Sequence, residues 1–217
     1  MFSQWSEDKI LTEFFQSQDG GFFVDVGAHD GIYFSNTYAL GLVGWTGICI
    51  EAHPDYADRC RENRPESICI HGACIGDDRD RVMFYTEPGG LFSSLSSDEG
   101  PVEQHYRNNL SLPFGGFQAI EVPALTLNSA LVSVGQPIDL ISIDVEGSEL
   151  DVLAGLDLEK YRPQVLLIEA NNELAARNLD RYLARQGYCL AGWRRVNHFY
   201  CAKADRARLG RLIRGTQ

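Results

Sequence analysis

The chain has 217 residues, which is enough for one α/β domain with a complete core, so we expect a single domain over residues 1–217. Its formal net charge of −11 disfavours partners such as nucleic acid or an anionic membrane surface. No apolar run is long enough to span a bilayer, and the first residues lack a basic segment followed by an apolar one, so we expect no membrane span and no secretory signal. The six cysteines form no C-x-x-C pair, and we expect reduced thiols in a cytoplasmic protein without a disulfide or zinc site.

The first predicted elements are a helix and a strand. Apolar residues recur on one side of residues 5–15, which predicts a helix that packs on the domain within residues 1–21. The apolar run Phe22–Val26 predicts a strand, Gly27 and Gly31 predict a turn, and Ser35–Leu40 resumes a helical pattern. A strand, a glycine turn and a helix form the cofactor cradle of a doubly wound sheet, because glycine lets backbone N–H groups approach a ligand.

The next strand indicates which cofactor the cradle holds. Gly47–Ile50 is followed by Glu51, 24 residues after Gly27, where an acid can accept hydrogen bonds from a ribose diol. The turn reads G-A-H-D-G and not the G-x-G-x-x-G of a dinucleotide site. The acids Asp25 and Asp30 would repel a diphosphate and suit the sulfonium and ammonium groups of S-adenosylmethionine. We therefore expect S-adenosylmethionine, with an NAD-dependent oxidoreductase as the alternative enzyme.

The middle of the chain contains two further strands and an irregular segment. Pro54 opens a helix, Ser67–Ile70 predicts the third strand, and Arg81–Thr86 predicts a further strand or an edge extension. Glu87–Gly116 is polar, rich in glycine and proline, and without strong periodicity. A segment of about 30 such residues in a compact domain is typically functional, so we expect an insert or lid over the site, with disorder as the alternative.

The C-terminal half returns to regular alternation. Strands are predicted at residues 117–122, 138–143 and 164–168, helices at 126–134 and 173–185, and an antiparallel hairpin at 188–194 and 198–202. The basic tail at 203–214 is expected to form a frayed surface helix. This order of elements predicts an α/β fold with a Rossmann-like, doubly wound, mostly parallel sheet and a C-terminal antiparallel hairpin.

Four acids mark one edge of the predicted sheet. Asp25, Glu51, Asp144 and Glu169 all stand at the carboxyl ends of predicted strands. Ligands of doubly wound sheets bind at this edge. Because structural acids have no reason to gather there, the pattern favours a binding or catalytic site.

Several segments of the chain carry a resemblance to a known family. They are FVDVGAHDG (Phe23–Gly31) with SNTY (Ser35–Tyr38), GICIEAHP (Gly47–Pro54) and IDVEGSELDVLAG (Ile143–Gly155), the last being the most specific. The sequence resembles the FkbM-type methyltransferases from about Ser3 to the final hairpin. This family transfers a methyl group from S-adenosylmethionine to hydroxyl oxygens, so the resemblance implies an O-methyltransferase with a seven-stranded methyltransferase sheet.

The resemblance also implies roles for individual residues. Glu51 would bind the ribose hydroxyls, Ala73 or Cys74 would line the adenine, and Asp144 and Glu146 would lie beside the sulfonium and the acceptor. The full cofactor set implied by the resemblance is Asp25, Gly27, Gly31, Ser35, Asn36, Glu51, Ala73, Cys74 and Asp144. An alternative for Glu146 is a purely structural role, because acids stabilise the first turn of a helix.

Methyl transfer to a hydroxyl needs alignment of the two reactants and a base for the hydroxyl proton. Asp144 is the first choice for the base and His198 the second. Oxygen ligands from Asp144, Glu169, Asn171 and Asn172 could hold Mg²⁺, which would acidify the acceptor hydroxyl, although these residues equally suit a strand end and a helix cap. The non-enzymatic alternative is a methyltransferase-like binding module without turnover.

The acceptor is expected to contact the irregular segment 87–116. This segment offers neutral hydrogen-bonding groups beside aromatic rings, which suit a sugar with its hydroxyl groups and apolar faces. The residues are Phe92, Ser93, Ser94, His105, Tyr106, Arg107, Asn108, Asn109 and Phe114. We expect a sugar or glycan hydroxyl as acceptor, with a polyketide-like hydroxyl of a natural product as the alternative, and we leave open whether the chain forms a homo-oligomer.

Overall fold

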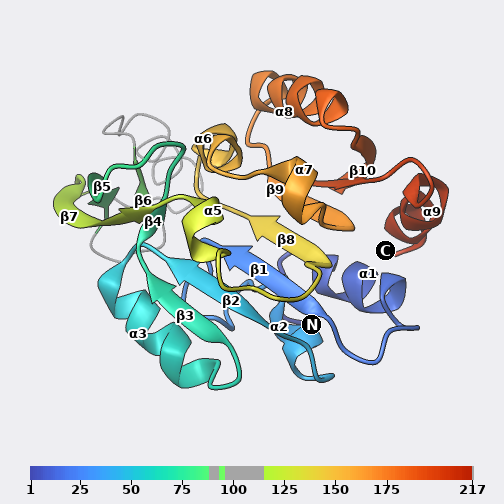
Figure 1. The fold of residues 1–217 in the computed structure, drawn as a ribbon, viewed down its shortest axis with the longest axis horizontal. Helices are drawn as coiled ribbons and strands as arrows, with labels where there is room; N and C mark the ends of the chain where they lie inside the picture. The colour runs from blue at the N-terminus through green and yellow to red at the C-terminus, as the bar shows by residue number, and fades with distance from the viewer. Residues whose placement is uncertain (88–92, 96–114, 217) are drawn as a thin grey trace.

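A computed structural model describes residues 1–87, 93–95 and 115–216. Its centre is a seven-stranded sheet in the order β10-β11-β9-β8-β1-β2-β3, which crosses the middle of the molecule (Figure 1). Strands β9, β8, β1, β2 and β3 are parallel, whereas β11 pairs antiparallel with both β9 and β10. The predicted fold class is therefore confirmed, including the antiparallel hairpin at the C-terminal end.

The strands of the central sheet are short and largely buried. In chain order they are β1 (Phe22–Val26), β2 (Thr46–Glu51), β3 (Ile68–His71), β8 (Leu140–Ile143), β9 (Val165–Glu169), β10 (Cys189–Arg194) and β11 (Asn197–Cys201). Every residue of β1, β8 and β9 is buried, as the continuous apolar runs in the sequence predict for strands covered on both faces.

Helices cover both faces of this sheet. Because side chains alternate along a strand, Phe23 faces one layer of helices while Val24 and Val26 face the other. On the Phe23 face lie α1 (Glu7–Phe14), α2 (Tyr38–Gly41), α3 (Pro54–Asn63) and α9 (Arg206–Gly215). On the opposite face lie α5 (Leu127–Ala130), α6 (Glu149–Ala154), α7 (Leu158–Tyr161) and α8 (Glu173–Arg185).

A second, smaller sheet has the order β4-β7-β5-β6. It consists of β4 (Ala73–Cys74), β5 (Arg81–Thr86), β6 (Ser93–Ser94) and β7 (Gln118–Leu125). The predicted strand at 81–86 is confirmed. The strand predicted at 117–122 continues to Leu125, because its last two residues pair with β4. Most of the expected insert 87–116 lies outside the described residues, so its role as a lid and the single-domain division stay predictions.

Two expectations about helices are wrong. The helix expected at 126–134 is limited to α5, where the Thr126 side chain caps the first turn by accepting a hydrogen bond from the Ser129 N–H at 3.2 Å. The C-terminal tail is not a frayed surface helix, because Leu209 and Ile213 of α9 are buried in the core beneath the Phe23 face. The apolar spacing of these two residues gives α9 one face that packs on the sheet, and the basic residues occupy its other side.

The connections between strands create a switch point at the centre of the sheet. The chain runs from β1 outward to β2 and β3, and later from β8 outward in the opposite direction to β9. The chain leaves β1 toward the helices of one face and β8 toward those of the other, so the loops after these two neighbouring strands diverge, and doubly wound sheets bind ligands at this point.

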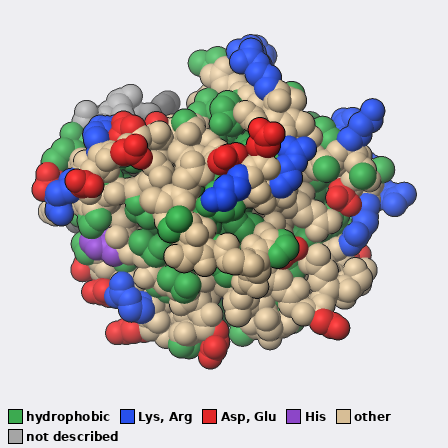
Figure 2. Space-filling view, in the orientation of Figure 1, with side chains coloured by type: hydrophobic (Ala, Val, Ile, Leu, Met, Phe, Trp, Pro, Cys, Tyr) green, Lys and Arg blue, Asp and Glu red, His purple; other side chains and the backbone are tan. Residues whose placement is uncertain are grey.

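The surface carries mixed charge. On the face shown in Figure 2, basic side chains stand in separate groups with acidic ones between them. In the part of the chain that the structure describes, no helix has both the length and the apolar composition needed to cross a membrane.

Candidate functional site

The turn after β1 is held tightly against both neighbouring strands. The N–H groups of Gly27 and Ala28 both donate to the Ile50 carbonyl, at 2.9 and 3.1 Å. Gly27 has a φ of +82°, and a Cβ at this position would overlap the backbone carbonyl of Asp144. Only glycine therefore lets the turn pass between the ends of β2 and β8.

Glu51 lies buried at the end of β2, beside this turn. Its Oε2 accepts a hydrogen bond from the His29 N–H at 2.8 Å, and its Oε1 accepts one from the His53 N–H at 2.7 Å. Burial raises the pKa of Glu51 to about 7, against the lowering effect of these two hydrogen bonds. The carboxyl group is thus fixed between the two loops that follow β1 and β2. The buried residues Ala73 and Cys74 follow closely, since the Gly72 N–H donates to the Glu51 carbonyl at 2.9 Å.

Asp25 lies on the Phe23 face of the sheet, and its hydrogen bonds hold the loop that follows the glycine turn. Thr37 Oγ1 donates to its Oδ2 at 2.6 Å, and Ser35 Oγ lies 3.5 Å from the same atom. The buried Arg64 guanidinium donates to Thr37 Oγ1 at 2.9 Å and to the Gly31 carbonyl at 2.8 Å. Burial raises the pKa of Asp25, while the Thr37 hydrogen bond and the Arg64 charge oppose that shift.

The neighbouring Asn36 links this loop to the adjacent strand. It is buried, and its Nδ2 donates to Ser142 Oγ of β8 at 3.2 Å. The structure therefore joins the expected site residues Asp25, Gly31 and Ser35 into one network, while Asn36 bonds separately to β8. Sequence reasoning missed Thr37 and Arg64, which complete that network.

Three acids meet at the carboxyl ends of β8 and β9. Carboxylate oxygens of Asp144, Glu146 and Glu169 lie within 4.8 Å of one another. Glu146 has a φ of +55°, and Gly147 beside it has a φ of +104°, so the backbone after β8 turns in the left-handed region. Asn171 Nδ2 donates to Glu169 Oε2 at 2.8 Å and approaches Glu146 Oε2 at 3.4 Å.

The acids of this cluster hold their protons unequally. Partial removal from water raises the pKa of Asp144 to about 6 and that of Glu146 to about 8, even though solvent still reaches both side chains. Burial, followed by the charges of Asp144 and Glu146, raises the pKa of Glu169 to about 11. A hydrogen bond with Glu169 lowers the pKa of Asp144 in return. At neutral pH, Glu169 therefore retains a proton and Asp144 is mostly ionised.

The same cluster contains the residues that could hold a metal ion. The three carboxyl groups are hard oxygen donors of the kind that Mg²⁺ prefers, so the donor chemistry fits the ion. Asn171 reaches the cluster through its amide nitrogen, which is a hydrogen-bond donor and no ligand. Asn172 caps α8 instead, because its Oδ1 accepts a hydrogen bond from the Ala175 N–H at 2.9 Å.

The described contacts of His198 are with aromatic rings and not with the acid cluster. It belongs to β11, where its ring stacks between Trp193 and Tyr200 at centroid distances of 6.1 and 6.3 Å. It pairs in register with Ile168, which faces the α8 side of the sheet, as Tyr200 does. Burial lowers the pKa of His198, which keeps the ring neutral at pH 7. Among the described residues, no hydrogen bond or ring contact joins His198 to the acid cluster.

The arrangement fits S-adenosylmethionine. Its ribose diol needs an acceptor near the end of β2, where Glu51 is fixed. Its sulfonium and ammonium groups are cationic, and the acids Asp144 and Glu146 follow β8 at the same edge of the sheet. At Gly27 a Cβ would meet the Asp144 carbonyl, so this point of the turn presents only backbone groups.

Fold and site together define the class of protein, which is a Rossmann-like, S-adenosylmethionine-dependent methyltransferase. The chain belongs to the FkbM methyltransferase family, because the family profile described as the methyltransferase FkbM domain matches residues 25–190. Among curated protein sequences, none matches the chain.

Solved structures of methyltransferases are similar to the chain. A TehB-like SAM-dependent methyltransferase from Corynebacterium glutamicum is 11% identical over 92% of this chain and 88% of its own, with a TM-score of 0.50. A putative RNA methyltransferase from Pyrococcus horikoshii is 10% identical over 93% and 88% of the two chains, with a TM-score of 0.48. M. capricolum TrmK in complex with S-adenosyl-homocysteine is 7% identical over 93% and 68%, with a TM-score of 0.49. Of the three, only the TehB-like structure supports the fold, and at 11% identity it supports nothing beyond the fold.

Proposed function

We propose that this protein transfers the methyl group of S-adenosylmethionine to a hydroxyl oxygen, and that the hydroxyl belongs to a sugar or glycan. The observation that carries the proposal is the position of Asp144. It directly follows β8 at the switch point, its backbone carbonyl touches the glycine turn, and a pKa of about 6 suits a base at neutral pH. Hydroxyl groups need such a base, because they are weak nucleophiles while protonated.

The cofactor-binding residues divide by position. Glu51 accepts hydrogen bonds from the ribose hydroxyls, and Gly27 and Gly31 shape the turn that faces the methionine end. Ala73 and Cys74 line the adenine, because the hydrogen bond from the Gly72 N–H to the Glu51 carbonyl brings them next to the end of β2. Asp25, Ser35 and Asn36 act through hydrogen bonds that fix the turn, and Thr37 and Arg64 assist them.

S-adenosylmethionine supplies an electrophilic methyl group with a neutral thioether as leaving group. The protein has to align the acceptor oxygen and remove its proton, and alignment alone can contribute up to about 7–11 kcal/mol. A carboxylate oxygen of Asp144 accepts the hydroxyl proton as the new carbon–oxygen bond forms. Protonated Glu169 donates a hydrogen bond that keeps Asp144 ionised and oriented. We place Glu146, whose carboxylate neighbours that of Asp144, beside the acceptor, and Asp144 ahead of His198 as the base.

The described surroundings of the site support a saccharide acceptor. Tyr33 and Phe34 follow the glycine turn with their rings 3.9 Å apart, and they are 50% and 41% exposed. Ser94 of β6 reaches the backbone carbonyl of Glu146 at 3.3 Å, which brings the second sheet to the acid cluster. Exposed ring faces suit the apolar faces of a sugar, and carboxyl and hydroxyl groups suit its hydroxyls. The net charge of −11 disfavours RNA as acceptor.

The test is methyl transfer from labelled S-adenosylmethionine to a panel of neutral saccharides, polyketide-like alcohols and RNA. We expect label on a saccharide oxygen, with loss of at least about 10²-fold in turnover for Asp144→Asn. Asp151→Asn serves as a matched control, because Asp151 lies on α6, beyond the acid cluster. Transfer to RNA or to a nitrogen atom, with none to any alcohol, would contradict the proposal.

A metal-assisted form of the same reaction has its own test. The convergence of three carboxyl groups favours it, since a divalent ion there would lower the pKa of an acceptor hydroxyl. Full activity in excess EDTA would remove Mg²⁺ from the mechanism. Loss of activity that Mg²⁺ restores would support it.

A further inference from the structure

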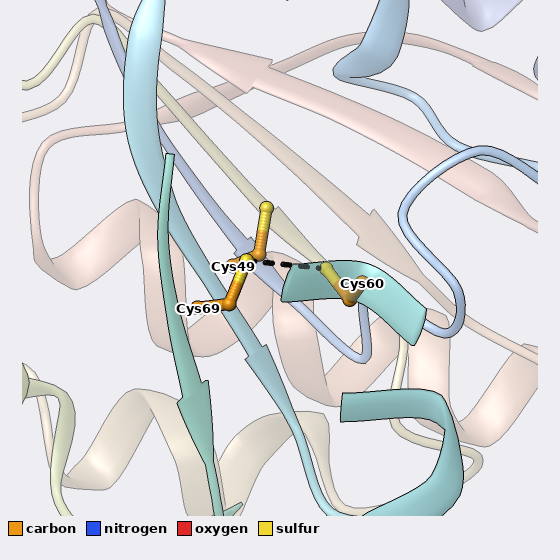
Figure 3. Close-up of side chains that lie close together, drawn as sticks. All are labelled: Cys49, Cys60 and Cys69. Atoms are coloured by element: carbon orange, nitrogen blue, oxygen red, sulfur yellow. Dashed lines mark hydrogen bonds between the residues drawn. The ribbon is translucent and has the colours of Figure 1, made fainter. Parts of the chain in front are cut away.

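Three cysteine side chains converge between the sheet and α3, away from the acid cluster. They are Cys49 of β2, Cys60 of α3 and Cys69 of β3, and Figure 3 shows them close together. Their sulfur atoms all lie within 4.8 Å of one another, and the Cys60 and Cys69 sulfurs are 3.6 Å apart. None of the three belongs to a disulfide.

The fold, and not the spacing in the sequence, brings these thiols together. Cys49 and Cys69 are direct partners in the parallel ladder of β2 and β3, so their side chains leave the sheet on the same face. Cys60 is buried on the side of α3 that packs on that face. The three positions are separated by 11 and 9 residues without a C-x-x-C pair, which is why no metal–thiolate site is expected from the sequence.

We propose that Cys49, Cys60 and Cys69 form a site for one thiophilic d¹⁰ metal ion, such as Zn²⁺ or Cu⁺, bound through the three sulfur atoms. A metal–sulfur bond of about 2.3 Å would place the sulfurs of a planar three-coordinate site about 4.0 Å apart. The observed separations of 3.6 Å and at most 4.8 Å bracket this value. Sulfur donors alone select soft ions and disfavour Mg²⁺ or Ca²⁺.

The site borders the cofactor turn. A Cβ on Gly31 would lie 3.0 Å from the Cys60 sulfur, and the Arg64 side chain packs on the same glycine. A metal ion bridging Cys60 to β2 and β3 would fix α3 against the sheet beneath this turn. Metal binding is therefore expected to raise the melting temperature of the protein, because the ion binds the folded arrangement of the three thiols.

The experiment uses the full chain, reduced, freed of metal by chelation and desalted without oxygen. It is titrated with Cd²⁺ as an optical probe, and separately with Zn²⁺ and Cu⁺. We expect one equivalent to bind with sulfur-to-metal charge-transfer absorption, which carboxylate ligands do not produce. Native mass spectrometry of the Zn²⁺ and Cu⁺ samples then shows which ion the site retains.

Variants identify the ligands. Cys60→Ser and Cys69→Ser should each weaken metal affinity by at least about 100-fold. Even the loss of a residue that only hydrogen-bonds to a metal ligand costs about 10–100-fold in affinity. Cys189→Ser is the matched control, because Cys189 lies on β10 and contacts the Cys201 carbonyl, and it should bind like the parent. Circular dichroism checks that each variant is folded, and Cys69→Ser is the more tolerant of the two because Cys69 is only half-buried.

Three results would overturn the proposal. They are the absence of charge-transfer absorption with all three ions, binding that Cys69→Ser leaves unchanged, and formation of a Cys60–Cys69 disulfide under mild oxidation in a protein that takes up no metal. The last result would identify the pair as a redox element. None of these readouts depends on methyl transfer, so they are independent of the proposed function.

Discussion

Substitution of Glu51 is the most direct probe of the cofactor site, because the structure shows which hydrogen bonds of this side chain support the fold. Both carboxylate oxygens already accept backbone N–H groups, at 2.7 and 2.8 Å. Glu51→Ala leaves two partly buried donors without that partner, at a cost of up to about 1–3 kcal/mol each. A total loss of about 2–6 kcal/mol is a large part of the 5–15 kcal/mol typical of a folded protein. Alanine would therefore mix unfolding with loss of binding.

Glu51→Gln is the milder change, since it keeps the side-chain shape and one oxygen acceptor and leaves one backbone N–H without its partner instead of two. At a hundredfold excess over its dissociation constant, S-adenosylmethionine should stabilise the parent by about 2.7 kcal/mol. At about 2–4 °C per kcal/mol, the melting temperature rises by roughly 5–11 °C. Loss of hydrogen bonds from the ribose to a charged acceptor costs about 1.5–3 kcal/mol, or roughly 10–150-fold in affinity.

At the same ligand concentration, the stabilisation of the Gln variant should fall to about 1.4 kcal/mol or less. Differential scanning fluorimetry with and without S-adenosylmethionine measures both values. Glu62→Gln, at an exposed acid of α3, is the control and should keep the full shift. If Glu51→Gln also kept the full shift, Glu51 would not contact the ribose, and the assignment of the β2 end to the cofactor would fail.

The remaining predictions concern the turn, the acid cluster and pH. Gly27→Ala should lose at least about 1–3 kcal/mol in urea unfolding, because of the +82° φ and the Asp144 carbonyl; unchanged stability would contradict the packing. Asp144→Asn should keep S-adenosylmethionine affinity within several-fold and lose at least about 10²-fold in turnover; loss of binding as well would make Asp144 a binding residue. Glu169→Gln, which mimics the protonated acid, should keep more turnover than Glu169→Ala, and equal losses would refute a neutral Glu169. The folded-state pKa of Glu51, about 7, lies above its ordinary value of 4.5, so its contribution to stability is complete below pH 4.5 and is lost as the pH rises to 7. Relative to Glu51→Gln, the free energy of unfolding of the parent should fall by on the order of 3 kcal/mol over that range. A difference that does not change with pH would contradict the burial of Glu51.

The central sheet was predictable because its strands are continuous apolar runs that end in acids. Glu51 and Glu169 close β2 and β9, and Asp144 directly follows β8. Parallel strands carry their carboxyl ends to one edge, so the gathering of these acids followed from topology alone. The long helix at 173–185 was also predictable, since Asn172 caps it and its apolar residues repeat with helical spacing.

Contacts between distant segments could not be predicted from local patterns. Arg64 donates hydrogen bonds to Gly31 and Thr37, which precede it by 33 and 27 residues. Nothing in the local sequence, where this arginine precedes a proline, predicts these two contacts. The register of β2 with β3 decides that Cys49 and Cys69 share a face, and a shift of one residue would separate them. The basic composition of α9 likewise concealed the two apolar residues that fix it to the sheet.

Calorimetric titration of the parent protein with S-adenosylmethionine, S-adenosylhomocysteine and NAD is the most direct test of the account. We predict one equivalent of each of the first two ligands, no heat from NAD, and binding by Glu51→Gln that is weaker by roughly 10–150-fold. Binding of NAD with none of S-adenosylmethionine would contradict the central claim, namely that the carboxyl ends of β1, β2 and β8 hold the methyl donor.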